Sequence, residues 1–168
     1  MNERSLSRIG CIILSLFPAL WGTFGFWNNM ADFEGTARNA VAPILSMKDT
    51  YQNPFLMWRS INTDWAAFFG LGVITALEAI AGTLATIGVI IMVVKLKSPY
   101  SDFQRGKSFA ILGSIIAILI WGIGFMIFAG DWFMSWQSSD NPLSVQLGAM
   151  IYMLPCTLSL LLLIFHKE

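Results

Sequence analysis

The most constraining feature of the sequence is the apolar run at residues 65–94, WAAFFGLGVITALEAIAGTLATIGVIIMVV. It contains a single ionisable side chain, that of Glu78, close to its middle. At ~1.5 Å per residue, a helix of this length exceeds the ~30 Å hydrocarbon core of a bilayer and can span it with some tilt. The run therefore predicts a transmembrane helix, and with it a membrane protein.

Three further apolar runs have the length of a transmembrane helix. They occupy residues 9–27, 108–130 and 144–165, and each is near the ~20 residues that a spanning helix needs. Only 12% of the 168 residues are charged, whereas about a quarter of a typical soluble domain is charged. We therefore expect an all-α membrane protein, with residues 1–168 forming a single bundle of four transmembrane helices.

The distribution of basic residues predicts the orientation of the bundle. One end carries seven of the ten Lys and Arg residues: Arg4, Arg8, Lys95, Lys97, Arg105, Lys107 and Lys167. The loops at the other end carry the remaining three: Arg38, Lys48 and Arg59. By the positive-inside rule, both termini and the 95–107 loop are predicted to be cytoplasmic, and the 28–64 and 131–143 loops extracytoplasmic. Because the net charge is zero, we expect no nucleic acid as a partner. The predicted transmembrane helices imply membrane lipids as partners.

The extracytoplasmic 28–64 loop carries two helix signals. Apolar residues recur at helical spacing over residues 34–47, where Pro43 is expected to kink or split the helix. Asn53 and Pro54 resemble an N-cap and a first helical position ahead of the segment FLMWRSI. We expect two short helices that rest on the outer end of the bundle.

Glu78 is the residue that poses the functional question. A carboxyl group at mid-bilayer depth is energetically costly and normally faces protein or water, not lipid. On the same face of the predicted helix, Ala81, Gly82 and Ala85 are small, as membrane helix contacts tend to be. The carboxyl is therefore predicted to point into the bundle. No basic residue is expected at its depth, so we expect the group to be uncharged.

Three residues of the other runs are predicted to lie near Glu78. Counting ~1.5 Å per residue along each run brings Ser15, Trp121 and Thr157 to a similar depth. Together with Glu78 they form a predicted intramembrane polar site. Three roles remain open for this site: a structural hydrogen bond to a neighbouring helix, the binding of a quinone or a lipid headgroup, and proton transfer.

Aromatic and polar residues crowd the predicted extracytoplasmic end. The candidate interaction face consists of Trp27, Asn28, Asp32, Trp58, Arg59, Asp131, Trp132, Trp136 and Gln137. One interpretation is an anchored lid whose indole rings sit at headgroup level. The other is a platform for a partner protein, because Trp and Arg dominate binding hot spots. An unpaired charge against packed rings is costly, so Arg59 is predicted to pair with Asp32 or Asp131.

The sequence lacks a recognisable arrangement of catalytic groups. It contains no phosphate-binding loop or metal-ligand spacing, and its one histidine, His166, lies in the C-terminal tail. Cys11 and Cys156 both fall within predicted spans, and we interpret them as packing residues. We therefore predict no catalytic residue, no metal and no cofactor.

Several phrases of the sequence resemble one family. They are FWNNMADFEGT, LSMKDT, LMWRSI, TALEAIAG, DFQRGKSFAILG and GFMIFAGDWFMSWQS. They are similar to the bacterial predicted small integral membrane proteins grouped as domain of unknown function 2165, over about residues 27–138. The sequence departs from that pattern at Asp131, where the family has Glu, and again after Ser138. The resemblance implies a four-helix inner-membrane protein and supplies no catalytic residue.

We interpret the chain as a non-catalytic accessory or assembly subunit of a larger bacterial inner-membrane complex. Docking would use the candidate interaction face and the small-residue helix faces, including that of Gly106, Ala110 and Gly113 in the third run. The expected partners are other inner-membrane subunits or a second copy of the chain. The alternative is a lipid- or quinone-binding protein, or a small transporter or enzyme, built around Glu78.

Overall fold

The computed structural model describes residues 2–139 and 143–168. In this part of the chain, four helical segments are long and apolar enough to cross a membrane. They are α1 (Glu3–Ala31), α4 (Asp64–Val94), α5 (Tyr100–Ile118) continued by the π-helix η3 (Leu119–Trp132), and α6 (Ser144–Phe165). The described residues form no strand. The prediction of an all-α membrane protein with four transmembrane helices is confirmed.

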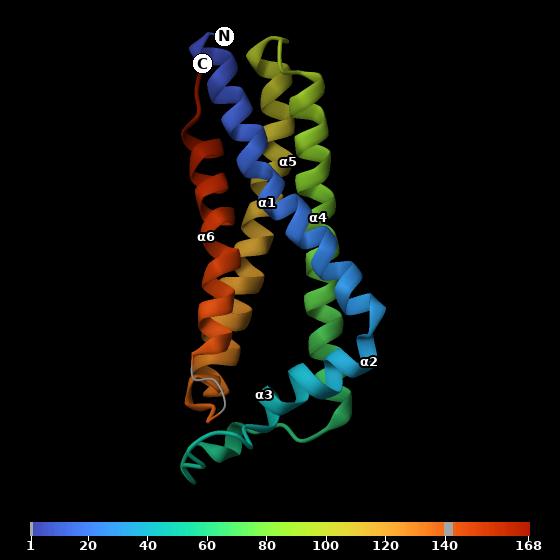
Figure 1. Ribbon diagram of the computed structural model, residues 1–168, viewed down its shortest axis with the longest axis vertical. Helices are drawn as coiled ribbons and strands as arrows, with labels where there is room; N and C mark the ends of the chain where they lie inside the picture. The colour runs from blue at the N-terminus through green and yellow to red at the C-terminus, as the bar shows by residue number, and fades with distance from the viewer. Residues whose placement is uncertain (1, 140–142) are drawn as a thin grey trace.

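The chain termini lie at one end of the bundle, beside the turn that joins α4 to α5 (Figure 1). We call this end the termini end. The opposite end, which we call the long-loop end, carries the short elements α2 (Phe33–Thr36), η1 (Ala37–Val41), α3 (Ala42–Ser46), η2 (Met57–Arg59) and η4 (Ser135–Gln137). Between these ends α1 runs diagonally across the bundle (Figure 1).

The four spanning helices share a core only in the half nearer the termini. Cys11 of α1, Met92 of α4, Phe103 and Ala110 of α5, and Leu163 of α6 form one fully buried cluster. Toward the long-loop end, α1 continues along α4 while η3 continues along α6. The two pairs move apart there, and α3 lies below the gap between their ribbons (Figure 1).

Glycine contacts hold α1 against α4. A Cβ atom added at Gly22 would lie 2.5 Å from the backbone nitrogen of Gly82, and one added at Gly82 would lie 2.5 Å from that of Thr23. No side chain fits at such a distance, so the two backbones are in direct contact. Gly88 of α4 meets the backbone of Gly106 in α5 in the same way, with an added Cβ 2.7 Å from the carbonyl oxygen.

These contacts correct one prediction. The small-residue face of the third span was expected to dock partner helices, but it packs inside the chain, as does the small-residue face of the second span. On α4 the buried small residues are Ala81, Gly82, Ala85 and Gly88, and on α5 they are Gly106, Ala110, Gly113, Ser114 and Ala117. Close backbone approach within the bundle already uses these surfaces, which are therefore not free for a second protein.

The helices are longer than the apolar runs that predicted them. α5 begins at Tyr100, eight residues before the predicted span, because Pro99 provides an extended N-cap and no breaker follows it. α1 continues to Ala31, so Asn28 and Asn29 lie on the helix and not in the loop. Its first turn is capped by Asn2, whose Oδ1 accepts a hydrogen bond from the backbone nitrogen of Ser5 at 3.0 Å.

The long loop forms one of the two expected helices in full. The elements α2, η1 and α3 follow one another over residues 33–46, with Pro43 in the first turn of α3. Ala37 of η1 packs against Ala67 and Leu71 of α4, so the segment rests on the bundle as predicted. The second expected helix is a single 3-10 turn at Met57–Arg59. Residues 140–142, in the segment after Ser138, lie outside the described part of the chain.

Candidate functional site

Glu78 is buried between α1 and α4, with 4% of its surface exposed. Its Oε2 accepts a hydrogen bond from Nδ2 of Asn29 at 2.8 Å. The carboxyl group lies against Gly25, where an added Cβ would be 2.7 Å from Oε1. Gly25 and Asn29 are one turn apart on α1, so one face of that helix makes room for the carboxyl and also binds it. Among the described residues, Oε1 has no hydrogen-bond partner.

The structure does not bring Ser15, Trp121 or Thr157 to Glu78. The hydroxyl of Ser15 donates to the Cys11 carbonyl at 2.7 Å, and that of Thr157 donates to the Met153 carbonyl at 3.0 Å. Trp121 stacks on Tyr152, with ring centroids 4.5 Å apart. Each of the three therefore has a partner other than Glu78, and no hydrogen bond of the described residues joins any of them to its carboxyl.

Helix register and divergence explain this difference. α1 is antiparallel to α4 with Gly22 opposite Gly82, so Ser15 lies ~10 Å further toward the termini end than the contact region. Trp121 belongs to the η3–α6 pair, and its ring stacks on Tyr152 of α6, which meets Trp21 of α1 edge to face. Equal depth in the bilayer places two residues side by side only where their helices are in contact.

Asn29, the residue that binds Glu78, was missed because the first span was predicted to end at Trp27. The sequence does contain a signal for the longer helix. The stretch after Trp27 has no glycine or proline before Gly35, so nothing in it breaks a helix. Continuing the helix by one turn places Asn29 on the face of Gly22 and Gly25.

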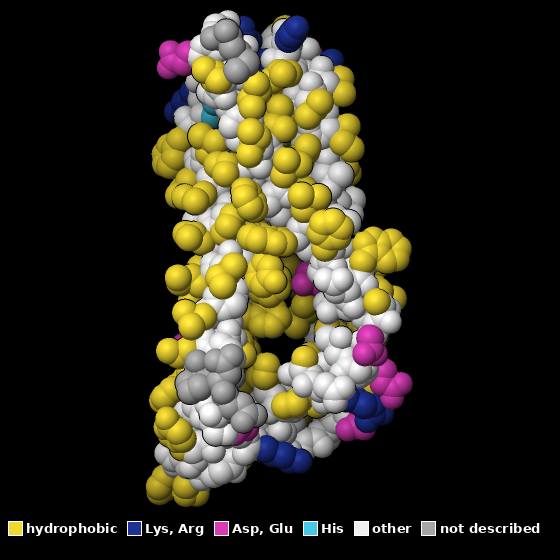
Figure 2. All heavy atoms as spheres, in the orientation of Figure 1, with side chains coloured by type: hydrophobic (Ala, Val, Ile, Leu, Met, Phe, Trp, Pro, Cys, Tyr) yellow, Lys and Arg dark blue, Asp and Glu magenta, His cyan; other side chains and the backbone are white. Residues whose placement is uncertain are grey.

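A hollow lies between the two diverging helix pairs, and its lining residue Ile74 is one turn along α4 from Glu78. It has a volume of about 130 Å³ and is lined by Val41, Ile44, Leu45, Gly70, Ile74, Gly124, Phe125, Phe128, Ala129 and Phe133. Figure 2 shows a hollow in this half of the molecule, with hydrophobic side chains around it and an acidic one at its edge. Gly70, Ile74 and Glu78 follow one another at four-residue spacing, so Glu78 is the next residue along the α4 wall of the hollow.

At the long-loop end, the predicted ion pair of Arg59 is wrong. Its guanidinium carbon lies 4.7 Å from the ring centroid of Trp132 and 5.6 Å from that of Trp58. Asp32 instead caps α2, where its Oδ1 accepts from the backbone nitrogen of Gly35 at 2.9 Å. Cation–π contact with two indoles thus takes the place of the expected carboxylate. Nε of Arg59 is buried and has no hydrogen-bond partner in the described residues.

The structure divides the predicted interaction face into two parts. Six residues form what we call the tip cluster: Tyr51, Phe55, Trp58, Arg59, Trp132 and Trp136. The rings of Trp58 and Trp132 meet edge to face, as do those of Tyr51 and Trp136. Gln137 supports the cluster, since its Oε1 accepts from the backbone nitrogen of Tyr51 at 3.0 Å.

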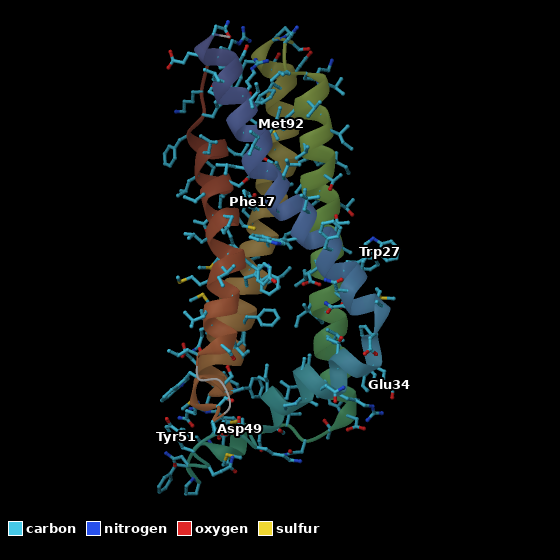
Figure 3. The ribbon with its side chains drawn as sticks, viewed as in Figure 1. Phe17, Trp27, Glu34, Asp49, Tyr51 and Met92 are labelled. Atoms are coloured by element: carbon cyan, nitrogen blue, oxygen red, sulfur yellow. The ribbon has the colours of Figure 1, made fainter. Side chains whose placement is uncertain are left out.

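The remaining members of the predicted face lie elsewhere. Trp27 and Asn28 are exposed on the last turns of α1, next to Asp32. Figure 3 shows Trp27 on the opposite side of the molecule from Tyr51. Asp131 is exposed near the end of η3. Trp27, Asn28 and Asp32 therefore do not share one surface with the tip cluster.

A buried charge cluster at the termini end was not predicted. Arg8, with only 1% of its surface exposed, pairs with both carboxylate oxygens of Glu168, at 2.5 Å from Nε and 2.7 Å from Nη2. Its Nη1 donates to the backbone carbonyls of Lys95, Leu96 and Ser98. Hydrogen bonds from Arg8, and then its charge, lower the pKa of the Glu168 carboxyl. One arginine thus ties α1 to the α4–α5 turn and to the segment after α6.

Lys107 completes this cluster from α5. Its Nζ donates to the His166 carbonyl at 2.6 Å and to the hydroxyl of Tyr100 at 2.9 Å. The His166 ring has its Nε2 at 3.1 Å from the hydroxyl of Ser7. Burial, and then the charge of Lys107, lower the pKa of His166, so its imidazole is neutral at pH 7. From the sequence, Arg8 and Lys107 were expected only to orient the bundle in the membrane.

The fold agrees with what similarity to known proteins shows. The family described as predicted small integral membrane protein, domain of unknown function 2165, matches residues 7–166. That range covers all four spanning segments, Glu78, the tip cluster and Lys107. No curated protein and no solved structure is similar enough to count as a match. The chain belongs to the domain of unknown function 2165 family of predicted small integral membrane proteins.

Proposed function

We propose that this protein is a non-enzymatic accessory subunit of a larger complex in the inner membrane of a bacterium. Its docking surface is the tip cluster, and its partner is the extracytoplasmic part of another membrane protein. The observation that carries the proposal is the exposure of large rings at the tip: 72% for Tyr51, 85% for Phe55 and 70% for Trp58.

The position of the tip favours docking over membrane anchoring. Rings that anchor a protein lie at the ends of its spanning helices, as Trp27 and Trp65 do. Tyr51, Phe55 and Trp58 instead belong to the loop before α4, which projects past the start of α6 along the long axis, where Figure 3 marks Tyr51. Large apolar rings exposed beyond the helix ends are typical of a surface that another protein covers.

The chemistry of the tip indicates what a partner must present. Trp, Tyr and Arg supply most of the binding energy in protein interfaces. The guanidinium of Arg59 is held by Trp58 and Trp132, and its buried Nε has no partner among the described residues. A partner that fits this arrangement offers an apolar groove for the rings and a carboxylate next to Arg59.

The test is purification from the native membrane in a mild maltoside detergent, with and without changes at the tip. We expect a second membrane protein to co-purify with the parent chain in fixed stoichiometry. Trp58→Ala combined with Phe55→Ala should reduce its recovery at least about tenfold, because losing one hot-spot ring costs about 2 kcal/mol. Quantitative mass spectrometry of the eluted proteins measures this.

The matched control changes exposed rings away from the tip. Trp27→Ala and Phe24→Ala remove side chains that are 64% and 57% exposed on α1, and should leave recovery of the partner unchanged. If the tip and α1 variants recover the same proteins, the tip does not dock a partner. If the tip variant only weakens retention in lipid vesicles, its rings act as anchors, and the proposal fails.

A further inference from the structure

The unpartnered oxygen of Glu78 and the hollow beside it carry an inference beyond docking. The carboxyl is buried, and among the described residues its only hydrogen bond is the one from Asn29 to Oε2. The ion pairs of the described residues involve other groups, so no Lys, Arg or His side chain neutralises Glu78. Buried acids normally have such a partner, and its absence leaves one oxygen able to bind a ligand.

The hollow supplies space for that ligand. Its volume of about 130 Å³ is close to that of protein cavities that accept a benzene-sized group. Gly70 and Ile74 on α4 lead along the helix to Glu78 at four-residue spacing, and Gly124 on η3 has no heavy atom within 4 Å of its Cβ position. A ligand can therefore have its apolar part in the hollow and its polar end at the carboxyl.

The lining of the hollow indicates the charge of that polar end. Three of its side chains are the rings of Phe125, Phe128 and Phe133, and its other members are aliphatic residues and glycine. The faces of aromatic rings attract cations, and this attraction strengthens away from water. A carboxylate, phosphate or sulfate headgroup would meet the Glu78 acid without any basic residue to bind it.

We propose that Glu78 and the hollow form a binding site for a lipophilic monovalent cation, such as an amine on an apolar chain. The ammonium group donates a hydrogen bond to Oε1 of Glu78, while Asn29 keeps Oε2 in place. The first carbons of the apolar chain occupy the hollow between α4 and η3, above η1 and α3, and the rest of a longer chain extends beyond it. An ammonium next to Oε1 favours the ionised form of a carboxyl that is expected to be uncharged without a ligand, and this distinguishes the cation from neutral amphiphiles of the same length.

The test compares two probes that differ only in their polar end. Dodecylamine, an ammonium at pH 7, and dodecanol are added separately at equal concentration to the purified full chain in maltoside micelles. Native mass spectrometry then measures the fraction of protein with one bound probe. We expect dodecylamine to bind more than dodecanol, and Glu78→Gln to lower dodecylamine binding about tenfold, the size of one charge-assisted hydrogen bond. Dodecanol binding should not change.

Two glycine variants test whether the apolar chain binds in the hollow, without altering Glu78. Gly124→Leu places a side chain in the hollow and should lower the binding of both probes. Gly148→Leu adds the same side chain on α6, where nothing lies within 4 Å of the Cβ position and no hollow residue is affected. It should bind both probes as the parent does. All variants are first compared with the parent by thermal unfolding, so that only folded proteins are scored.

Two results would overturn the inference. The first is a failure to recognise the cation, seen either as equal dodecylamine binding by the parent and by Glu78→Gln or as a preference for dodecanol. The second concerns the apolar chain. Unchanged binding in Gly124→Leu would show that the chain lies elsewhere. Neither result bears on docking through the tip cluster, which is tested by recovery of a protein partner.

Discussion

At the scale of single residues, Arg8 is the buried charged side chain that connects the segments at the termini end. Its guanidinium makes hydrogen bonds to Glu168 and to three backbone carbonyls of the α4–α5 turn, and it lies 4.6 Å from the ring centroid of Phe103. A fully buried charge is tolerated only when it is paired and hydrogen-bonded to this degree. The residue therefore joins α1, the α4–α5 turn and the segment after α6.

Replacing Arg8 should strongly destabilise the protein. Arg8→Gln removes the charge and takes this donor from the Glu168 carboxylate and from three backbone carbonyls, which we expect to lower the free energy of unfolding by about 3–5 kcal/mol. Arg4 also pairs with Glu168, at 2.8 Å, but is 51% exposed, so Arg4→Gln should cost about 1 kcal/mol or less. Unfolding by dodecyl sulfate in mixed micelles measures both. Equal effects of the two changes would contradict the role assigned to Arg8.

The burial of Glu78 was predictable from the sequence, whereas its partner was not. Depth and the small residues around it predicted that the carboxyl points inward, and it does. The bond from Asn29 depends on where α1 ends and on how it is rotated against α4. The cation–π position of Arg59 was also missed, because two indoles from distant segments hold the guanidinium where a carboxylate was expected.

At the scale of elements, the α1–α4 pair is built on backbone contact. Gly22 and Gly82 face each other so closely that even a methyl group has no space. In a bilayer the hydrophobic effect does not drive helices together, so close packing of this kind supplies much of their attraction. The same contact sets the register that brings Asn29 to Glu78.

Alanine substitutions should show how much the helix–helix contact contributes to stability, apart from the effect of alanine on helix propensity. Gly82→Ala and Gly22→Ala each force the backbones apart, and we expect each to lower the free energy of unfolding by about 1–3 kcal/mol. Gly148→Ala on α6 meets nothing within 4 Å and should be neutral or stabilise by up to about 1 kcal/mol. Dodecyl sulfate titration of the three variants measures the difference. A destabilisation of the same size at Gly148 would contradict the claim that the Gly22–Gly82 backbone contact stabilises the α1–α4 pair.

The helix lengths could be predicted from the sequence only in part, because hydropathy does not mark where a helix ends. Hydropathy identifies the segment that lies in lipid, but a helix continues until a residue breaks it or a cap ends it. α1 and α5 both continue into polar sequence, where Asn29 and Lys107 make their decisive contacts. Spans read from hydropathy alone therefore assigned both residues to loops.

At the scale of the whole molecule, the bundle is closed at the termini end and divided at the other. The buried cluster of Cys11, Met92, Phe103, Ala110 and Leu163 and the charge cluster around Arg8 hold all four helices together at one end. Toward the other end the two helix pairs separate, and the hollow lies between them above the loop helices. The proposed ligand site and the clusters that join all four helices thus occupy opposite halves of the bundle.

The orientation of the whole molecule gives a further prediction. Seven of the ten basic residues belong to the termini end, so we expect that end to be cytoplasmic. Lys48→Cys and Lys97→Cys each replace one exposed lysine, at opposite ends. In intact spheroplasts, a membrane-impermeant maleimide should label Lys48→Cys, and should label Lys97→Cys only after lysis.

The parent chain is the control for this labelling experiment. Its two cysteines, Cys11 and Cys156, are both fully buried, so the parent should remain unlabelled in both conditions. The reverse pattern, with Lys97→Cys labelled before lysis, would place the termini outside the cytoplasm. It would also move the tip cluster to the cytoplasmic side and remove the proposed extracytoplasmic partner.

The sequence by itself determined that this is a four-helix membrane protein of the domain of unknown function 2165 family, with Glu78 turned inward. Apolar run length and the cost of a charge in lipid are local properties, and each can be read from a continuous segment. Only the tertiary structure decided that Asn29 binds Glu78, that Arg8 reaches Glu168, and that a hollow lies between the helix pairs. Those contacts depend on how helices cross and separate, and crossing angles arise from packing between segments far apart in the chain.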